Sequence, residues 1–311
     1  MNFLIARPAR IEAVGRPLQN AAKNPRVAAG RRDLFTSMSG LLVSTGDQVH
    51  DGNPPSICRD PVLGVVAPTL GQAPPLRYKR LKSLAKWVAR TPLHPQWLLG
   101  GRRPPAGLNS FSGMLLDIGA GDRWIEAKLP ADANYVALDF PATGRDLYGA
   151  TPHVFADAAV LPFTDASFDG VVCLEVLEHV RDPAAVMMEI ARVLKPGATA
   201  WLSMPFLYPV HDAPFDFQRF TEHGLRRDST RAGLELTQFK PSLHALRSAG
   251  LLASLAVAGG VSASPALLAA VLLLPATVLV TGINLLSYGL SLLWPDWPAL
   301  TAGYECEVRR S

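Results

Sequence analysis

Acidic residues follow short apolar runs at several points in the middle of the chain. Asp117 lies in the apolar run 114–118 and precedes Gly119-Ala120-Gly121, whereas Asp139 and Asp157 end two later runs. Paired glycines let the main chain adopt positive φ and approach a ligand closely. A carboxylate roughly 20 residues beyond such a turn is placed to bind ribose hydroxyls. The types and spacing of these residues therefore predict a site for a nucleotide-like ligand.

The glycine turn does not fit a dinucleotide. A dinucleotide fold has a third glycine that lets the helix approach the strand beneath the pyrophosphate, and that position here is Trp124. Asp122 would also place a negative charge beside the phosphates. The turn better suits a ligand whose carboxylate is bound by main-chain N–H groups of the turn and of the helix that we expect to follow it.

The turn belongs to a longer series of motifs. In this order and spacing, the series resembles the class I S-adenosylmethionine-dependent methyltransferases of the small-molecule type, over roughly residues 110–240. The motifs are Asp117-Ile118-Gly119-Ala120-Gly121, Asp139, Asp157-Ala158-x-x-Leu161-Pro162-Phe163, Ser167-Phe168-Asp169, Leu177-Glu178-His179-Val180 and Arg192-Val193-Leu194-Lys195-Pro196-Gly197. Ala198 and the pair Asp122-Arg123 depart from the family pattern, and neither departure removes a ligand-binding group.

The resemblance implies S-adenosyl-L-methionine as the cofactor and suggests which residues bind it. The turn is implied to bind the methionine part, the next acid the ribose, and the third acid with its neighbour the adenine. Two residues after the fourth strand are implied to close the site. In that order, the implied cofactor residues are Asp117, Gly119, Ala120, Gly121, Asp139, Asp157, Ala158, Glu175 and Val176.

Strand and helix patterns alternate from residue 114 onward, which is typical of a parallel sheet with helices on both faces. We expect an α/β, Rossmann-like fold with a seven-stranded, mostly parallel sheet, an antiparallel last strand, and a hydrophobic helical insertion between strands six and seven. The expected strands are 114–118, 135–139, 153–157, 168–176, 199–204, 234–239 and 299–309, with helices at 182–194 and 222–233.

A loop rich in proline, aromatic and ionisable residues follows the fifth strand, over 204–221. It begins at the carboxyl edge of the predicted sheet, where open α/β sheets bind their ligands. A substrate must approach the methyl group from this edge. We therefore interpret the loop as a substrate lid, with Tyr208 and Arg219 as substrate-binding residues.

Methyl transfer to a hydroxyl requires a group that removes the hydroxyl proton, and the ordinary pKa of imidazole suits that role. His211 in the lid is the predicted catalytic base, with Asp212 or Asp216 orienting its ring. The alternative is that His211 and Arg219 only tie the lid down through these two acids. His179 is interpreted as a helix residue with a structural hydrogen bond.

The charge of the chain is unevenly distributed. Residues 1–110 contain 16 Lys and Arg against 5 Asp and Glu, and the remaining residues contain 14 against 21. Residues 1–76 have no period that could bury a face, so we interpret them as a disordered basic leader. Residues 77–105 are interpreted as a basic amphipathic helix, over 77–90, and a linker. This helix either packs on the domain or contacts anionic lipid headgroups.

The three cysteines, Cys58, Cys173 and Cys306, have neither an even number nor a metal-ligand spacing. We therefore expect no disulfide framework and no metal site. This cysteine usage is typical of a reducing, cytoplasmic location.

Residues 248–295 contain no charged residue, which is enough chain for two bilayer crossings of about 20 residues each. Because the flanking strands belong to one sheet, the chain must leave and return on the same side of a membrane. Two spans, a re-entrant hairpin and an in-plane hairpin all satisfy this condition, with turns at Gly259-Gly260, Pro265 or Pro275. The alternative is an apolar lid or a dimer interface. The predicted methyltransferase domain then comprises 106–247 and its last strand, 296–311.

These features favour an S-adenosylmethionine-dependent methyltransferase at the cytoplasmic face of a membrane. We expect O-methylation of a lipid-linked, envelope-glycan or other small-molecule substrate, because the lid pattern Pro-x-His-x-x-Pro-x-Asp-Phe-x-Arg-Phe-Thr resembles bacterial methyltransferases with envelope-glycan functions. The alternative is a catalytically silent methyltransferase-like module that binds cofactor or a membrane. A nucleic-acid partner is not expected, because the basic residues lie mainly in a leader without interleaved aromatics.

Overall fold

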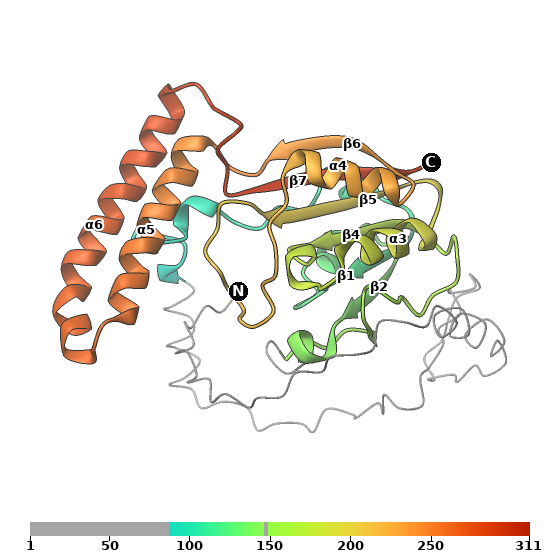
Figure 1. The fold of residues 1–311 in the computed structure, drawn as a ribbon, viewed down its shortest axis with the longest axis horizontal. Coiled ribbons are helices and arrows are strands. Elements are labelled where there is room, and N and C mark those ends of the chain that lie inside the picture. Colours follow the sequence, from blue (N-terminus) through green and yellow to red (C-terminus); the bar gives the residue numbers. More distant parts are fainter. Residues whose placement is uncertain (1–86, 146–148) are drawn as a thin grey trace, which may run out of the picture. The chain divides into compact units, whose positions relative to one another are not determined.

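The computed structural model describes residues 87–145 and 149–311 (Figure 1). The predicted leader, most of the predicted basic helix, and Cys58 lie outside the described residues. The described part of the predicted linker contains one short 3-10 helix, η1 (Trp97–Leu99), and a second one, η2 (Leu108–Ser110), follows just before the sheet.

Seven strands form one sheet in the order β3-β2-β1-β4-β5-β7-β6. The first five strands run parallel, and β7 lies antiparallel between β5 and β6. This order confirms the predicted fold, including the antiparallel last strand. The strands are β1 (Gly113–Ile118), β2 (Ala133–Asp139), β3 (Val154–Phe155), β4 (Phe168–Leu174), β5 (Leu194–Pro205), β6 (Leu234–Pro241) and β7 (Gly303–Arg310).

The register of the sheet aligns the carboxyl ends of its central strands. Ile118 at the end of β1 pairs with Leu138 on β2 and with Cys173 on β4. The residues that follow these strands therefore emerge at one edge, which is where an α/β sheet of this type binds its ligand. The main buried cluster packs against the strands and includes Leu116, Phe168, Val171, Ile190 and Leu202.

Two α-helices of the domain follow the sequence prediction closely. Helix α3 (Pro183–Val193) begins after Asp182, whose carboxylate accepts a hydrogen bond from the N–H of Ala185. Helix α4 (Glu222–Arg231) begins after Thr221, whose hydroxyl accepts one from the N–H of Gly224. Such caps satisfy main-chain donors that have no partner within the helix.

The predicted helix after the glycine turn is wrong. The chain between β1 and β2 forms turns and a single 3-10 helix, η3 (Glu126–Lys128). Arg123 has a φ of 56°, and a left-handed residue at this point is incompatible with a continuing α-helix. Pro130 further along cannot donate a helical hydrogen bond. Two other short segments replace regular helices, η4 (Pro141–Arg145) after β2 and η5 (Leu177–His179) after β4.

The apolar insertion between β6 and β7 forms two helices, α5 (Ala245–Ala263) and α6 (Ala266–Leu293). They lie side by side as a helical hairpin, which turns at Ser264 and Pro265. Gly259-Gly260 lies within α5 and Pro275 within α6, so neither of these predicted turn points is used. Both helices are long and apolar enough to cross a membrane, with mean hydropathies of 1.4 and 2.4.

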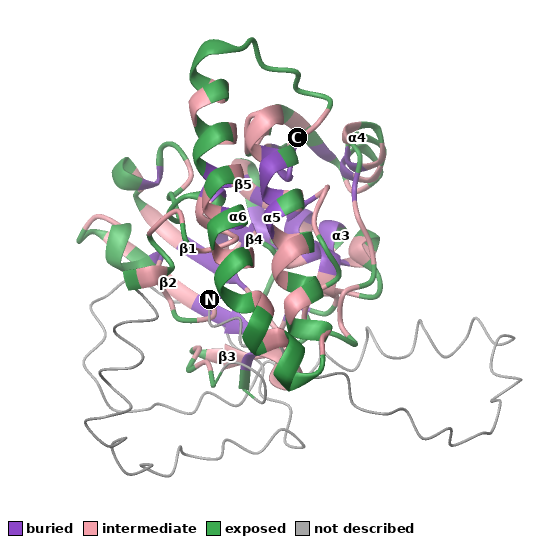
Figure 2. Ribbon diagram, turned by 90° about the vertical axis from the view of Figure 1, so that its left-hand side faces the viewer, coloured by how far each residue is buried: buried purple, intermediate pink, exposed green. Residues whose placement is uncertain are grey.

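The two helices of this hairpin are covered to very different degrees. Helix α5 packs on the domain through Leu251, which clusters with Leu98 and Ala302. In α6 only Val280 and Asn284 are buried, and Figure 2 shows a largely exposed outer face. Large side chains are exposed along the whole helix, including Leu267, Val271, Leu274, Leu286 and Leu293.

Candidate functional site

The glycine turn after β1 is closely packed on one side and open on the other. Gly119 has a φ of 73°, and a Cβ there would lie 2.3 Å from Cγ2 of Val176. A Cβ on Gly121 would meet only the carbonyl oxygen of Gly119, at 3.9 Å. The structure therefore brings together Gly119 and Val176, two predicted cofactor residues, and leaves space beside Gly121.

The main-chain donors of this turn are held within the protein. The N–H groups of Gly119 and Ala120 both donate to the carbonyl oxygen of Leu138. The N–H of Gly121 donates to Oδ2 of Asp139 at 2.9 Å, and Oδ1 of the same carboxylate accepts from the N–H of Phe140. These bonds fix the distance between the turn and the acid predicted to bind ribose. They differ from the expectation that free N–H groups of a following helix would bind the ligand.

Asp117 is a buried carboxyl beneath the turn. It is 4% exposed, and the hydroxyl of Tyr135 donates a hydrogen bond to its Oδ2 at 2.6 Å. The pKa of Asp117 is raised to about 7, mainly by burial; the hydrogen bond from Tyr135 opposes this rise, and the nearby Asp139 and Asp122 carboxylates add to it. A cationic ligand group beside Asp117 would favour its charged form.

The remaining predicted cofactor residues lie after β3 and β4. Asp157 is exposed and accepts a hydrogen bond from the N–H of Ala159, whereas Ala158 is buried in the core. Glu175 has a φ of 55° and accepts a hydrogen bond from the Ser203 hydroxyl at 2.7 Å. Surrounding protein atoms raise the pKa of the Glu175 carboxyl although the residue keeps an exposed surface. The positive φ of Glu175 is a strained main-chain conformation, and such strain is frequent at ligand sites.

The lid places His211 against Asp216 and Arg219. Nδ1 of His211 lies 3.1 Å from Oδ2 of Asp216, whose side chain is 1% exposed. The Arg219 guanidinium binds both oxygens of Asp216, with its Nη2 at 2.8 Å from Oδ2, and also reaches the carbonyl of Tyr208. Burial alone would raise the pKa of Asp216, but the hydrogen bonds from Arg219 and from the N–H of His211 lower it to about 2. Asp216 is thus the acid that orients His211.

Tyr208 connects the lid to the apolar hairpin. Its hydroxyl accepts a hydrogen bond from Nε2 of Gln96, its ring packs against the cluster of Leu98 and Leu251, and it meets the His211 ring edge-on at 5.5 Å. The lid therefore lies between the carboxyl edge of the sheet and α5, as Figure 1 also shows.

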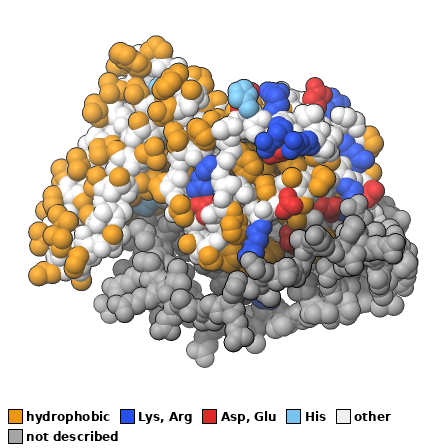
Figure 3. All heavy atoms as spheres, in the orientation of Figure 1, with side chains coloured by type: hydrophobic (Ala, Val, Ile, Leu, Met, Phe, Trp, Pro, Cys, Tyr) orange, Lys and Arg blue, Asp and Glu red, His pale blue; other side chains and the backbone are white. Residues whose placement is uncertain are grey.

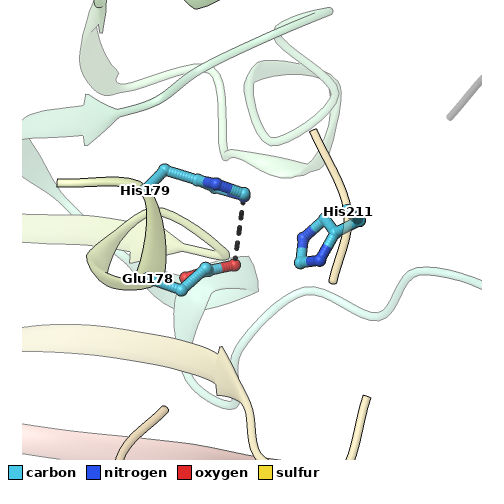
Figure 4. A group of neighbouring side chains, drawn as sticks. All are labelled: Glu178, His179 and His211. Atoms are coloured by element: carbon cyan, nitrogen blue, oxygen red, sulfur yellow. Dashed lines mark ion pairs between the residues drawn. The ribbon is translucent and has the colours of Figure 1, made fainter. Parts of the chain in front are cut away.

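A second group of side chains was missed from the sequence. Glu178 and His179 on η5 lie beside His211 of the lid, with one potential metal-ligand atom of each within 4.8 Å of the others. Figure 4 shows the three side chains pointing toward one another, with Nε2 of His179 at 3.5 Å from Oε1 of Glu178. The Glu-His pair is separated from His211 in the sequence by helix α3, strand β5 and part of the lid, so no short motif identifies the group.

Similarity to known proteins is found over the part of the chain that runs from β1 to β5. Residues 116–202 match a family described as methyltransferase domain. The ubiquinone biosynthesis O-methyltransferase of Xanthomonas oryzae pv. oryzae is 33% identical over 130 residues, covering 38% of this chain and 54% of that protein. The protein of the same name from Hahella chejuensis is 36% identical over 99 residues, covering 29% and 42%.

Residues 116–202 are a class I S-adenosylmethionine-dependent methyltransferase domain. The chain spans about half the length of the curated relatives that it matches. Among solved structures, phosphoethanolamine N-methyltransferase 2 of Haemonchus contortus in complex with S-adenosyl-L-methionine is similar with a TM-score of 0.41 and 13% identity, covering 72% of this chain and 59% of that one.

The methyltransferase domain has a cradle that fits its cofactor, S-adenosylmethionine. The turn at Gly119 and Gly121 is open on one side, and the Asp117 and Asp139 carboxyls lie at its base. When bound, the cofactor supplies an activated methyl group on sulfur. The individual contacts of the predicted cofactor, catalytic and substrate residues remain predictions.

Proposed function

We propose that this protein is an O-methyltransferase that acts on a hydroxyl of a lipid-linked acceptor while its apolar hairpin rests in the cytoplasmic face of a membrane. One observation carries the proposal. The lid over the carboxyl edge of the methyltransferase domain packs through Tyr208 against the buried cluster that includes Leu251 of α5. A hairpin in the lipid would therefore hold the substrate side of the site at the membrane surface.

The chemistry requires a base for the acceptor hydroxyl, and we assign this role to His211. Its Nδ1 faces Asp216, and we assign the acceptance of the proton to the other ring nitrogen, Nε2. Asp216 stabilises the resulting imidazolium, as a charged partner does in other histidine bases. The acceptor oxygen then forms a bond to the methyl carbon as the carbon–sulfur bond breaks, and S-adenosylhomocysteine leaves. Arg219 positions Asp216 and would contact the substrate at the lid.

The relatives support a hydroxyl acceptor of this kind. Their names describe O-methyltransferases of ubiquinone biosynthesis. The hairpin supports a lipid-linked acceptor, because hydrophobic side chains crowd its surface whereas charged side chains gather over the sheet (Figure 3). Exposed apolar patches of this size mark interaction surfaces.

The geometry of the hairpin favours insertion into one leaflet over two complete spans. Residues 255–279 include no buried position, whereas Ser248, Leu251 and Ser254 on α5 are buried against the rest of the domain. At 1.5 Å per residue, the uncovered arms of α5 and α6 are about 14 and about 21 Å long. The hydrocarbon core of a bilayer is about 30 Å thick. We infer a re-entrant or in-plane hairpin, with the exposed Trp294 and Trp297 at the interface.

The catalytic proposal is tested by turnover of S-adenosylmethionine with membrane lipid extracts and by mass spectrometry of the methylated product. His211→Ala should lower the rate by about 100-fold or more, in the range of a lost general base, while calorimetric cofactor binding persists. Near-normal turnover with lowered thermal stability would leave His211 as scaffold. Cofactor binding without turnover in the wild type would favour the catalytically silent module.

The membrane proposal is tested by flotation of the full chain with liposomes containing anionic lipid. Val271→Glu and Leu274→Glu should lower the bound fraction by about tenfold or more, because each replaces a side chain whose burial contributes about 1.5–3 kcal/mol. Val160→Glu is the matched control, since Val160 is 66% exposed, like Val271 at 65%, but lies outside the hairpin. A cysteine at Ser264 should resist labelling from the far side of the bilayer. Labelling from that side would instead demonstrate two spans.

A further inference from the structure

Glu178 is a buried carboxyl group, and burial raises its pKa well above the usual range. Its side chain is 0% exposed, and among the described residues neither Oε1 nor Oε2 has a hydrogen-bond partner. Burial of an ionised group without such bonds is costly, and proteins usually offset it with a charged partner or a metal ion. The residue therefore requires an explanation that the methyltransferase fold alone does not provide.

Two histidines face this carboxylate, and each has its Nδ1 held by an outer oxygen. Nδ1 of His179 lies 3.0 Å from the carbonyl oxygen of Phe215, and Nδ1 of His211 lies 3.1 Å from Oδ2 of Asp216. A hydrogen bond at Nδ1 fixes the tautomer that leaves Nε2 as a metal ligand, and outer carbonyl or carboxylate partners of this kind are typical of metal-binding histidines. His179 presents Nε2 to Glu178 at 3.5 Å.

We propose that Glu178, His179 and His211 bind a divalent transition-metal ion. Two imidazoles and one carboxylate form a ligand set used by Zn²⁺ and by other borderline metals, with further coordination positions open to solvent or substrate oxygen. Oδ2 of Asp212 lies 3.8 Å from Nε2 of His179 and is placed to serve as an additional ligand.

The distances between the three ligand atoms are slightly longer than metal coordination requires. Bonds of about 2.0–2.2 Å to nitrogen and oxygen place two ligand atoms at most about 4.4 Å apart. The three atoms lie within 4.8 Å of one another, so a modest approach of the lid toward η5 completes the site.

A metal at this position would join the lid to the methyltransferase sheet at the point where substrate enters. In the metal-bound state His211 would be a ligand instead of the proton acceptor assigned above, and the cation would polarise an acceptor oxygen bound at an open position. The metal site rests on the contacts of Glu178 and the two histidines, so it does not depend on the identity of the acceptor or on methyl transfer.

The test is metal binding by the full chain, freed of metal and titrated with Zn²⁺ alone, with the bound metal measured by elemental analysis. Co²⁺ substitution gives absorption bands that report nitrogen and oxygen coordination. We expect one Zn²⁺ per chain, and at least tenfold weaker binding in His179→Ala, His211→Ala and Glu178→Gln. His223→Ala is the control, because His223 is exposed on α4.

Circular dichroism and calorimetric cofactor binding on each variant separate loss of the site from loss of the fold. Glu178→Gln is nearly isosteric and keeps the proposal testable where an alanine variant unfolds. Wild-type protein without stoichiometric Zn²⁺ binding would overturn the proposal, as would folded variants that bind like the wild type. Neither result bears on methyltransferase turnover, which is measured separately in the metal-free protein.

Discussion

Ser254 on α5 donates a hydrogen bond to Asn284 on α6, at 3.0 Å, in an otherwise apolar helical hairpin. The amide nitrogen of Asn284 donates in turn to the main-chain carbonyls of Pro92 and His94. Both side chains are fully buried. This network ties the two helices to each other and to the segment preceding the sheet.

Replacing Asn284 with leucine should loosen this attachment. The substitution leaves the Ser254 hydroxyl and the Pro92 carbonyl without this partner, whereas the His94 carbonyl still accepts from the N–H of Trp97. A lost buried hydrogen bond costs about 1–3 kcal/mol. Thermal unfolding in detergent should show a corresponding decrease in Tm. Asn134→Leu is the control, because Asn134 is exposed on β2. Equal Tm values for both variants would mean that the network does not hold the hairpin.

Arg219 should be important for lid stability. Its removal would leave the buried Asp216 carboxylate with only the His211 contacts, and breaking a buried ion pair costs about 3 kcal/mol or more. Arg219→Ala should therefore destabilise the protein in denaturant unfolding. Arg226→Ala breaks only an exposed pair with Glu222 and should cost less than about 1 kcal/mol. A small effect at Arg219 would show that the lid is held elsewhere.

A methyl group on Gly119 should disturb the cofactor turn more than one on Gly121. Both residues have positive φ, so alanine strains the main chain at either position by about 1–2 kcal/mol. Only at Gly119 would the new Cβ also meet Val176, at 2.3 Å. Gly119→Ala should lower Tm and cofactor affinity more than Gly121→Ala, and adding Val176→Ala should restore part of the stability. Without such restoration, the contact with Val176 would not be the cause.

The raised pKa of Asp117 predicts a specific pH dependence. In the folded protein without ligand this carboxyl titrates near pH 7, whereas in the unfolded chain it titrates at about 4. Between these values the folded state binds more protons, so the free energy of unfolding falls as pH rises, by up to about 1.4 kcal/mol per pH unit.

Urea unfolding between pH 4 and pH 8 tests this dependence. Asp117→Asn should reduce the slope relative to the wild type, whereas the exposed Asp132→Asn should not. Parallel curves for wild type and Asp117→Asn would contradict the raised pKa.

The sheet could be predicted because each buried strand is an apolar run ending in an acid or a turn, as at Asp117 and Asp139. The apolar insertion was equally clear from its lack of charge. The absent helix after β1 could not be foreseen, because it depends on the left-handed conformation of Arg123, a residue type that normally tolerates helix. The proximity of Glu178 and His179 to His211 depends on how the lid folds back, and no spacing rule encodes that.

The pairing of β6 with β7 has a consequence for the hairpin. Pro241 pairs with Tyr304, and the N–H of Ser242 donates to the carbonyl of Gly303. The chain thus leaves and re-enters the sheet at one point, as it would around an ordinary tight turn. Seen from the sheet, the apolar hairpin is an oversized loop, and its uncovered part, residues 255–279, can be lengthened, shortened or exchanged without changing the register of any strand.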